Sequence, residues 1–581
     1  MDFKKEIIKV LRKTIDEVKI DESMLEVPPH QDMGDFTLPC FTFSKELKKS
    51  PADIAQDMVR KIVLRKPVRR VEVKGPYLNF FIDKTMMAES IASEISKQKD
   101  KYGSAAGQSG GKAEKGSGKE KVMVEYPSPN TNKPLHLGHI RNMLIGNSVS
   151  ETIGFLGGKA VRANVNNDRG IHICKSMLAY RKFGRGKKPG RNEKTDHFVG
   201  KWYVKFNEEA EKNPKLEEEA AEMLKRWEDG DKDVVKLWKL MNAWAYNGFE
   251  ETYERLGISF DTYYYESDYY CRGKDIVKKA LKDNKRFREE DNGAISVKLE
   301  DLGLPDKVLL RGDGTSVYMT QDIYLAVQKF RDYKLDRSIY VVGSEQDMHF
   351  KQLFRILEVI GYKWAEEGRL IHLSHGMVYL PEGRMKSREG TVVDADDLID
   401  EMVRVAEKEI KERDPKISRK ELKKRSETIG LCALKFYMLK TDPKKDMTYN
   451  PEESISFEGE TGPYVQYTYA RICSIMRKHG KRINLKADFR LLKEPMEITL
   501  IRLLHDFPSR VEEARHNLRP SVIANYLIQL CQSFNSFYHK IPVLDAPDEK
   551  TKNARLVLLR MVRQVIANGL DLLGIEYVER M

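Results

Sequence analysis

The sequence lacks paired cysteines, and this absence excludes several kinds of protein. Six cysteines are scattered over 581 residues, at positions 40, 174, 271, 432, 473 and 531, and no two of them form a C-x-x-C pair. Such scatter argues against a disulfide framework and against a structural zinc site. We therefore expect a protein of the reducing cytoplasm, and we predict no metal ligands.

Long apolar runs are also missing. No stretch approaches the roughly 20 apolar residues that a membrane-spanning helix needs, so no contact with a membrane is expected. The N-terminus places Phe3, Ile7, Leu11 and Ile15 on one helical face with acidic residues between them, which indicates a folded helix rather than a signal peptide.

Acidic residues are fewer than basic ones. The chain has 89 acidic and 102 basic residues, a formal net charge of +13. This excess suits a polyanionic partner such as a nucleic acid, but it is equally consistent with a highly charged, solvated surface.

The length of the chain predicts several domains. Residues 101–121 are rich in glycine, serine and lysine, which predicts a flexible linker. The first 100 residues predict an α+β module, in which two strands joined by a turn lie between residues 70 and 82. Residues 122–398 alternate strand-like runs with amphipathic helices, the pattern of a Rossmann-type α/β domain with a parallel sheet. The runs are Val122–Tyr126, Ala160–Val165, Ser338–Val342 and Leu370–His375.

Helical patterns occupy the rest of the chain. Residues 185–245 are dominated by lysine and glutamate at helical spacing and predict a helical insertion within the α/β domain. Residues 399–455 predict a helical connection, and residues 456–581 predict an all-α bundle. Two apolar stripes at helical spacing predict core faces of that bundle, one from Ile523 to Tyr538 and one from Leu559 to Leu573.

The segment from Glu125 to His139 carries the clearest chemical motif. It follows an apolar strand and precedes a helix-compatible run, so His136-Leu-Gly138-His139 lies at a helix N-terminus. Unpaired N–H groups and a partial positive charge favour an anion there. Gly138 permits close approach of a nucleotide, and the two imidazoles can donate hydrogen bonds to phosphate oxygens. Taken alone, the motif is equally consistent with a helix start and two incidental histidines.

A second motif, Gly383 to Gly390 (GRMKSREG), is short, basic and bounded by glycine. A mobile basic loop suits phosphoryl chemistry, because cations must close on charge as it develops. Taken alone, it is also consistent with a charged surface turn.

The two motifs, in this order, resemble the HIGH and KMSKS signatures of the class I aminoacyl-tRNA synthetases. Further blocks resemble the arginyl-tRNA synthetases in particular: Ser128-Pro129-Asn130, Asn167-Asp168-x-Gly170, Glu266-Ser267, Gly314-x-x-x-Tyr318-x-x-x-Asp322, Val342-x-x-Glu345-Gln346-x-x-His349 and Gly462-Pro463-Tyr464-Val465-Gln466-Tyr467. The second motif departs from KMSKS, with Arg384 and Ser387 at its lysine positions. Arginyl enzymes often depart in this way, and a lysine before the HIGH motif, here Lys133, is thought to compensate.

The resemblance implies a ligase that activates L-arginine with ATP and Mg²⁺ and transfers it to tRNA(Arg), without zinc, with the tRNA required for activation. We expect a monomer. The residues implied for ATP and catalysis are Lys133, His136, Gly138, His139, Arg384, Met385, Lys386, Ser387 and Arg388. Those implied for arginine are Glu125, Asn130, Glu266, Tyr318, Asp322 and Gln346. The carboxylates among them suit the five hydrogen-bond donors of a guanidinium. Those implied for tRNA are Tyr77, Asn79, Phe81, Tyr464 and Arg471.

Three alternatives stay open. Other class I synthetases share the fold, although many carry Cys/His zinc clusters that are missing here. A catalytically inactive relative that binds RNA would also retain these blocks. Finally, Tyr77, Asn79 and Phe81 alternate on one strand face and can stack on an unpaired base, but the same pattern is typical of a strand core.

Overall fold

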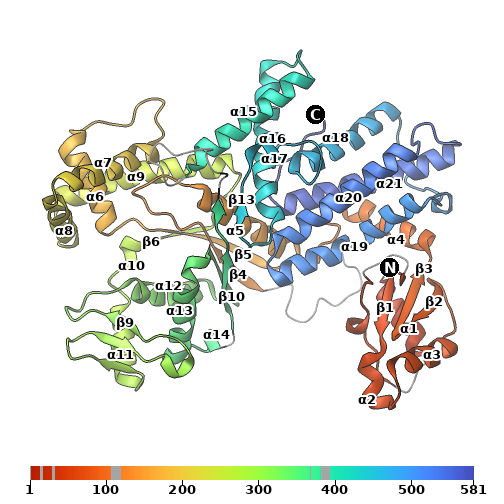
Figure 1. The fold of residues 1–581 in the computed structure, drawn as a ribbon, viewed down its shortest axis with the longest axis horizontal. Coiled ribbons are helices and arrows are strands. Elements are labelled where there is room, and N and C mark those ends of the chain that lie inside the picture. Colours follow the sequence, from red (N-terminus) through yellow and green to blue (C-terminus); the bar gives the residue numbers. More distant parts are fainter. Residues whose placement is uncertain are drawn as a thin grey trace.

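A five-stranded parallel sheet lies at the centre of the molecule (Figure 1). The structure is a computed structural model, which describes residues 2–13, 18–28, 33–105, 120–366, 368–379, 381 and 393–581. The strands of the central sheet are β4 (Lys121–Glu125), β5 (Lys159–Asn166), β6 (Thr262–Tyr265), β10 (Arg337–Gly343) and β11 (Leu370–His375), in the order β11-β10-β4-β5-β6. The four predicted strands are confirmed. Strand β6 was not predicted, because its Thr-Tyr-Tyr-Tyr sequence is half-buried throughout and has no aliphatic run.

The order of the strands alone indicates where a ligand should bind. Strand β4 has β5 on one side and β10 on the other, so the direction of winding reverses between β4 and β10. In sheets of this kind ligands bind beyond the carboxyl ends of the strands at that switch point. The turn that contains His136 begins just beyond the carboxyl end of β4.

Helix α5 (Leu137–Phe155) leaves this turn and is buried along nearly its whole length. One side packs on the sheet, where Gly146 lies against the ring of Tyr126 so closely that a Cβ would be 2.3 Å from a ring carbon. The other side meets the C-terminal bundle, where the Ser148 hydroxyl donates to the Leu572 carbonyl at 2.8 Å. A continuous core therefore joins α5 to the C-terminal bundle.

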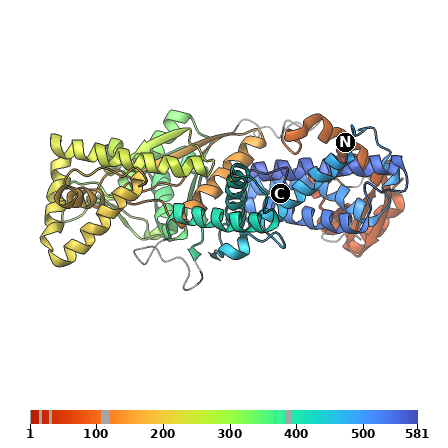
Figure 2. The same ribbon diagram turned by 90° about the horizontal axis from the view of Figure 1, so that it is seen from above.

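The predicted helical insertion is confirmed and is larger than predicted. It comprises α6 (Ile171–Ala179), α7 (Thr195–Lys212), α8 (Lys215–Glu228) and α9 (Lys232–Arg255), which enclose a core of their own. Figure 2 shows these helices at one end of the elongated molecule. A small antiparallel sheet, β7 (Phe287–Glu289), β8 (Ile295–Val297) and β9 (Lys307–Leu310), was not predicted because its strands are only three or four residues long.

Helices α12 (Tyr318–Tyr333) and α13 (Asp347–Ile360) flank strand β10 in the chain, and short α10 (Glu266–Tyr269) follows β6 directly. The all-α C-terminal part is confirmed, apart from the two-residue strand β13 (Met447–Thr448). Its main helices are α15 (Ala395–Arg413), α16 (Arg419–Lys440), α18 (Gly462–His479), α19 (Pro495–Asn517), α20 (Pro520–Lys540) and α21 (Glu549–Leu572). The two predicted apolar stripes lie on α20 and α21 and are buried, except Tyr538, which is 37% exposed. In the described part of the chain, no helix has the length and apolar character to cross a membrane.

The N-terminal module is α+β, as predicted. Strands β2 (Val68–Lys74) and β3 (Tyr77–Ile82) form the predicted hairpin, and β1 (Phe36–Pro39), which was not predicted, pairs with the other edge of β3. Helices α1 (Phe3–Arg12), α3 (Pro51–Lys61) and α4 (Lys84–Gln98) complete the module. It lies beside the bundle helices α19 and α21 (Figure 1).

The first residues of the predicted flexible linker are ordered, which corrects the prediction for residues 101–105. Tyr102 is buried, and its hydroxyl donates to the Leu504 carbonyl of α19 at 2.9 Å. Asn568 of α21 donates to the carbonyls of Lys99 and Tyr102 at 3.1 Å. One aromatic residue among small polar ones was enough to anchor residues 101–105 on the bundle, and residues 106–119 lie outside the described residues.

Candidate active site

The HLGH turn is built as a helix cap. His136 is the N-cap of α5, and its Nδ1 accepts a hydrogen bond from Gly138 N at 3.2 Å. His139 returns the contact, since its Nδ1 accepts from His136 N at 3.1 Å. The two rings lie 3.8 Å apart. A Cβ on Gly138 would be 3.1 Å from the His136 ring, so glycine lets this ring fold back over the helix start.

This geometry determines where the imidazole protons are. Burial, with a smaller effect of nearby Lys133, lowers the pKa of His136 to about 4 and holds the pKa of His139 well below its usual range. Both rings are therefore neutral at pH 7. Because each Nδ1 accepts a hydrogen bond, the proton of each neutral ring is assigned to Nε2. The turn thus offers two Nε2–H donors that carry no charge of their own.

Lys133 lies exposed on the loop that leads into the turn. Its neighbour Pro134 packs under the insertion, where a Cβ on Gly200 of α7 would be only 2.7 Å from Pro134 Cδ. The backbone of the loop is therefore held against α7 while the lysine side chain remains in solvent.

Glu125, which is predicted for the arginine site, already has a charged partner inside the protein. It is buried at the end of β4, and its carboxylate accepts a hydrogen bond from Lys329 of α12, which is fully buried. The charge of Glu125 is therefore already balanced inside the protein. Sequence reasoning missed Lys329, because a lysine in an amphipathic helix is normally exposed.

The remaining residues predicted for arginine lie around the same edge of the sheet. Glu266 is the first residue of α10, directly beyond the carboxyl end of β6, and is 5% exposed. Tyr318 is the first residue of α12 and is 71% exposed. Asp322 lies one helical turn later and contacts His349 Nε2 at 2.7 Å. Asn130 and Gln346 are both exposed, in the loop after β4 and at the start of α13.

Glu266 lies in a strained electrostatic environment. Burial raises its pKa to about 7, with Asp168 and Asp322 adding to the rise and Arg169 opposing it. A second buried carboxylate near the first is unfavourable unless a cation joins them. Glu266 and Asp322 together are therefore suited to receive a positively charged ligand.

The second predicted motif cannot be placed in the same way. Arg384, Met385, Lys386, Ser387 and Arg388 all lie outside the described residues.

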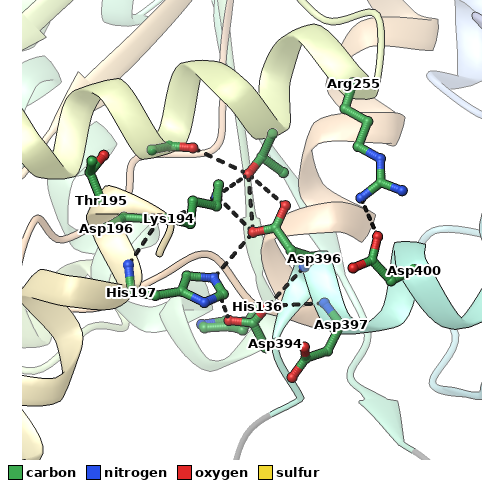
Figure 3. A network of polar contacts seen from close by, with 12 residues as sticks. His136, Lys194, Thr195, Asp196, His197, Arg255, Asp394, Asp396, Asp397 and Asp400 are labelled. Carbon is green, nitrogen blue, oxygen red and sulfur yellow. Dashed lines mark hydrogen bonds and ion pairs between the residues drawn. The ribbon is translucent and has the colours of Figure 1, made fainter. Parts of the chain in front are cut away.

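A network of charged residues lies beside the HLGH turn and was not predicted (Figure 3). Lys194, the N-cap of α7, donates through Nζ to Asp196 at 3.1 Å and to Asp396 at 2.7 Å. His197 Nε2 lies 3.2 Å from Asp394 and 3.3 Å from Asp396. Burial opposes charge on His197, but these carboxylates outweigh it and raise its pKa to about 9. We call these five residues the insertion clamp.

The clamp is connected to the turn through the main chain. His136 and Asp394 form an antiparallel bridge, in which Leu137 N donates to the Val393 carbonyl at 2.9 Å and Ala395 N donates to the Leu135 carbonyl at 3.0 Å. The start of α7 in the insertion is thus tied to the start of α15, and the start of α15 to the histidine turn.

Part of the clamp has the composition of a metal site. The ligand atoms of Asp196, His197 and Asp396 lie within 4.8 Å of one another. The ammonium of Lys194 lies between the two carboxylates and already supplies a positive charge there. The expectation that the protein needs no zinc remains a prediction.

The N-terminal residues predicted for RNA contact are less exposed than expected. Asn79 is 2% exposed and Phe81 is 9% exposed, with the Arg70 guanidinium 3.9 Å above the Phe81 ring. Tyr77 is half-buried and meets Phe41 edge-on at 5.6 Å. The amide of Asn79 is covered because it lies on the central strand of the sheet, between β1 and β2. Asn79 and Phe81 are therefore packed within the sheet, and their contact with RNA stays a prediction.

Tyr464 and Arg471 lie on α18 and share one partner. Arg471 Nη1 donates to the Asn535 Oδ1 at 2.6 Å, and Asn535 Nδ2 donates to the Tyr464 hydroxyl at 2.9 Å. The Arg471 guanidinium also lies over the Tyr467 ring, 4.5 Å from its centroid. The result is a half-buried platform of aromatic rings and one cation on the bundle surface.

The organisation of the chain matches three family models. The model described as tRNA synthetases class I (R), catalytic domain, matches residues 104–450. The arginyl tRNA synthetase N-terminal domain matches residues 1–82, and the DALR anticodon binding domain matches residues 465–581. The sheet, the histidine turn and the catalytic-domain match define a class I aminoacyl-tRNA synthetase.

Full-length relatives narrow the class further. The arginine–tRNA ligase of Treponema denticola is 44% identical over 98% of this chain and 96% of its own length. That of Bacteroides thetaiotaomicron is also 44% identical, over 94% of each chain. The solved arginyl-tRNA synthetase of Thermus thermophilus has a TM-score of 0.80 at 28% identity, covering 100% of this chain and 99% of that one. The chain belongs to the arginyl-tRNA synthetase family.

Proposed function

We propose that the protein joins L-arginine to tRNA(Arg) in two steps. First, a carboxylate oxygen of arginine attacks the α-phosphorus of ATP, and pyrophosphate leaves to give arginyl-adenylate. A terminal ribose hydroxyl of the tRNA then attacks the arginyl carbonyl carbon, and AMP leaves with transfer of the hydroxyl proton to solvent. The observation that carries this proposal is the shared edge of the sheet, where the histidine turn follows β4 and the acidic pocket begins at the end of β6.

The histidine turn is the proposed ATP site. Neutral Nε2–H donors on His136 and His139 stabilise negative charge as it develops on the phosphates, and Lys133 adds a mobile positive charge. Magnesium enters as the counter-ion of ATP. No general base is required, because the arginine carboxylate is already ionised, so catalysis is positioning together with charge stabilisation.

The acidic pocket is the proposed arginine site. Glu266 and Asp322 accept hydrogen bonds from the guanidinium, and Tyr318 covers it from the start of α12. Asn130 and Gln346 hold the amino and carboxylate groups of the substrate. For Glu125, its pairing with Lys329 supports a role in holding the end of β4 rather than direct contact with the side chain of arginine.

The two ends of the chain are the proposed tRNA-binding parts. Residues 1–100 contact the D-loop of the tRNA through the strand that carries Tyr77, Asn79 and Phe81. Residues 456–581 bind the anticodon arm through the platform of Tyr464 and Arg471. Residues 122–398 hold the catalytic site, and residues 399–455 connect the two. We place the enzyme in the cytoplasm as a monomer, where its tRNA is available.

Pyrophosphate exchange is the experiment that tests this function. The purified full chain should exchange labelled pyrophosphate into ATP only when arginine and its tRNA are both present, and it should charge bulk tRNA with arginine alone among the amino acids. Tight tRNA binding without charging would contradict the proposal and support a catalytically inactive relative.

A further inference from the structure

Asp168 is a buried carboxylate that the proposed reaction does not use. It lies two residues beyond β5 and is 2% exposed. Its Oδ1 accepts a hydrogen bond from the main-chain N–H of Ser267 at 2.9 Å. Its Oδ2 accepts from the Ser267 hydroxyl at 2.7 Å and from the Tyr246 hydroxyl at 3.0 Å.

The main chain of Asp168 is held as firmly as its side chain. Its carbonyl accepts from Trp238 Nε1 at 2.6 Å and from Asn242 Nδ2 at 3.2 Å. Both donors, like Tyr246, lie on α9 of the insertion. Asp168 therefore connects α9 on one side with Ser267 on the other through five hydrogen bonds, one of them buried and four partly buried.

Ser267 is the residue immediately after Glu266. Helix α10 has only four residues and no side-chain cap, so its own hydrogen bonds do little to fix its direction. The two hydrogen bonds from Ser267 to Asp168 hold the first turn of this helix and, with it, the Cα–Cβ direction of Glu266. Hydrogen bonds to an ionised acceptor are about twice as strong as neutral ones, which suits such an anchor.

The charge of Asp168 is costly at this place. The carboxylate accepts the two hydrogen bonds from Ser267 on two different oxygens, which an amide with a single oxygen cannot do. It also adds a negative charge near Glu266 and Asp322. Arg169 offsets part of this cost. A cation in the pocket would offset more of it, because that cation is attracted by all three carboxylates.

We propose that Asp168 is a positioning residue for arginine, acting through Ser267 to hold the Glu266 carboxylate at the angle that a planar guanidinium requires. The inference rests on the proposed function, in which Glu266 binds the side chain of arginine. A guanidinium needs its acceptors in a fixed plane, whereas ATP makes no use of that plane. A less firmly held Glu266 carboxylate should therefore weaken the binding of arginine and leave the binding of ATP unchanged.

A double-mutant cycle tests this inference with the full-length enzyme. Asp168→Asn places an amide nitrogen opposite the two hydroxyls, and should raise the arginine KM in pyrophosphate exchange by about tenfold while the ATP KM stays unchanged. In a Glu266→Gln background, Asp168→Asn should raise the arginine KM no further, because it acts through the side chain already altered. Tyr263→Phe is the matched control, since it removes a hydroxyl between β6 and α9 that contacts exposed Glu250 at 2.7 Å; it should leave both constants unchanged.

Three outcomes would overturn the inference: an unchanged arginine KM in folded Asp168→Asn, an equal rise in both KM values, or additive effects in the double variant. Thermal melting shows whether Asp168→Asn folds. If it does not, Ser267→Ala, which removes one hydroxyl and keeps the carboxylate, tests the same link, and an unchanged arginine KM in that variant overturns it. If Glu266→Gln alone leaves the arginine KM unchanged, the arginine-site assignment itself fails, which distinguishes that failure from one confined to Asp168.

Discussion

At the scale of single residues, Glu266 is the more buried of the two carboxylates proposed to bind the guanidinium of arginine. Replacing it by Gln removes the charge and keeps the shape. The loss of a buried charged partner costs about 2–5 kcal/mol of binding free energy. We expect Glu266→Gln to raise the arginine KM by more than an order of magnitude with little change in the ATP KM, as measured by pyrophosphate exchange with tRNA present. An unchanged arginine KM would contradict the assignment.

The same residue predicts a pH dependence. Burial raises the pKa of Glu266 to about 7, so the free enzyme loses the negative charge as the pH falls through neutrality. A guanidinium binds the ionised form, so the arginine KM should rise as the pH falls below 7, approaching tenfold per pH unit. The ATP KM should not follow this curve, because His136, with a pKa of about 4, stays neutral over the same range. A Glu266→Gln enzyme should show a flat profile, and a wild-type arginine KM that is constant from pH 8 to pH 6 would exclude this titration.

Lys133 is the residue-scale test of charge compensation. Because the basic motif has serine at one lysine position, Lys133 is the candidate cation for the leaving pyrophosphate. Lys133→Ala should slow adenylate formation by at least tenfold, a loss of roughly 1.4 kcal/mol or more of transition-state stabilisation. Affinity for tRNA should remain nearly unchanged in a filter-binding assay. If activation survives, compensation by Lys133 is excluded, although the family assignment is not.

At the scale of elements, the insertion clamp ties α7 to the start of α15. Lys194→Met removes the ammonium between Asp196, which is fully buried, and Asp396. Removing one partner of a buried ion pair costs about 3–5 kcal/mol. The variant should melt at a lower temperature and form adenylate more slowly, because Asp396 no longer holds α7 against the start of α15, whose preceding main chain is bridged to His136.

Lys201→Met is the control for the clamp. Lys201 is on the same helix, but its ion pair with Glu193 is near the surface, where such pairs contribute about 0–1 kcal/mol. If both lysine variants lose equal stability and equal activity, the clamp has no special role.

Local patterns explain which elements were predictable from the sequence. The histidine turn was predictable because a strand, a polar loop and a helix start follow one another within the segment from Glu125 to His139. The partners of Asp168 were not, since they lie 70 to 99 residues away, and the Lys194–Asp396 contact spans 202 residues. Such contacts depend on the packing of separate elements, which residue spacing does not encode. The same limit applies to Lys329, whose burial follows from the position of α12 against β4.

At the scale of the whole molecule, Asp35 joins the N-terminal module to the bundle. Its Oδ1 accepts from Arg502 Nε of α19 at 2.8 Å and from Lys84 of α4, while its Oδ2 accepts from Ile82 N at 2.8 Å. One buried carboxylate thus holds both proposed tRNA-binding parts in a fixed relation.

Asp35→Ala should loosen the contact between the N-terminal module and the bundle. Two cations lose their shared carboxylate, so stability should fall by about 3–5 kcal/mol. The KM for tRNA in aminoacylation should rise, because the tRNA no longer meets two pre-aligned surfaces, while the arginine KM stays the same. Asp57→Ala, which removes a surface carboxylate of the same module that pairs with Lys49, should change neither constant. A rise in the arginine KM, or an unchanged tRNA KM, would show that Asp35 does not act by aligning the tRNA-binding parts.

The bond from Ser148 to Leu572 has a consequence for synthesis on the ribosome. Helix α5 follows the histidine turn and emerges early, but Leu572, at the end of the helix that covers it, is translated 424 residues after Ser148. A nascent chain that has not yet released α21 carries the histidine turn on a helix with an uncovered apolar side. That side is a natural binding surface for a chaperone. We therefore expect the histidine turn to reach its final geometry only after α21 has packed against α5.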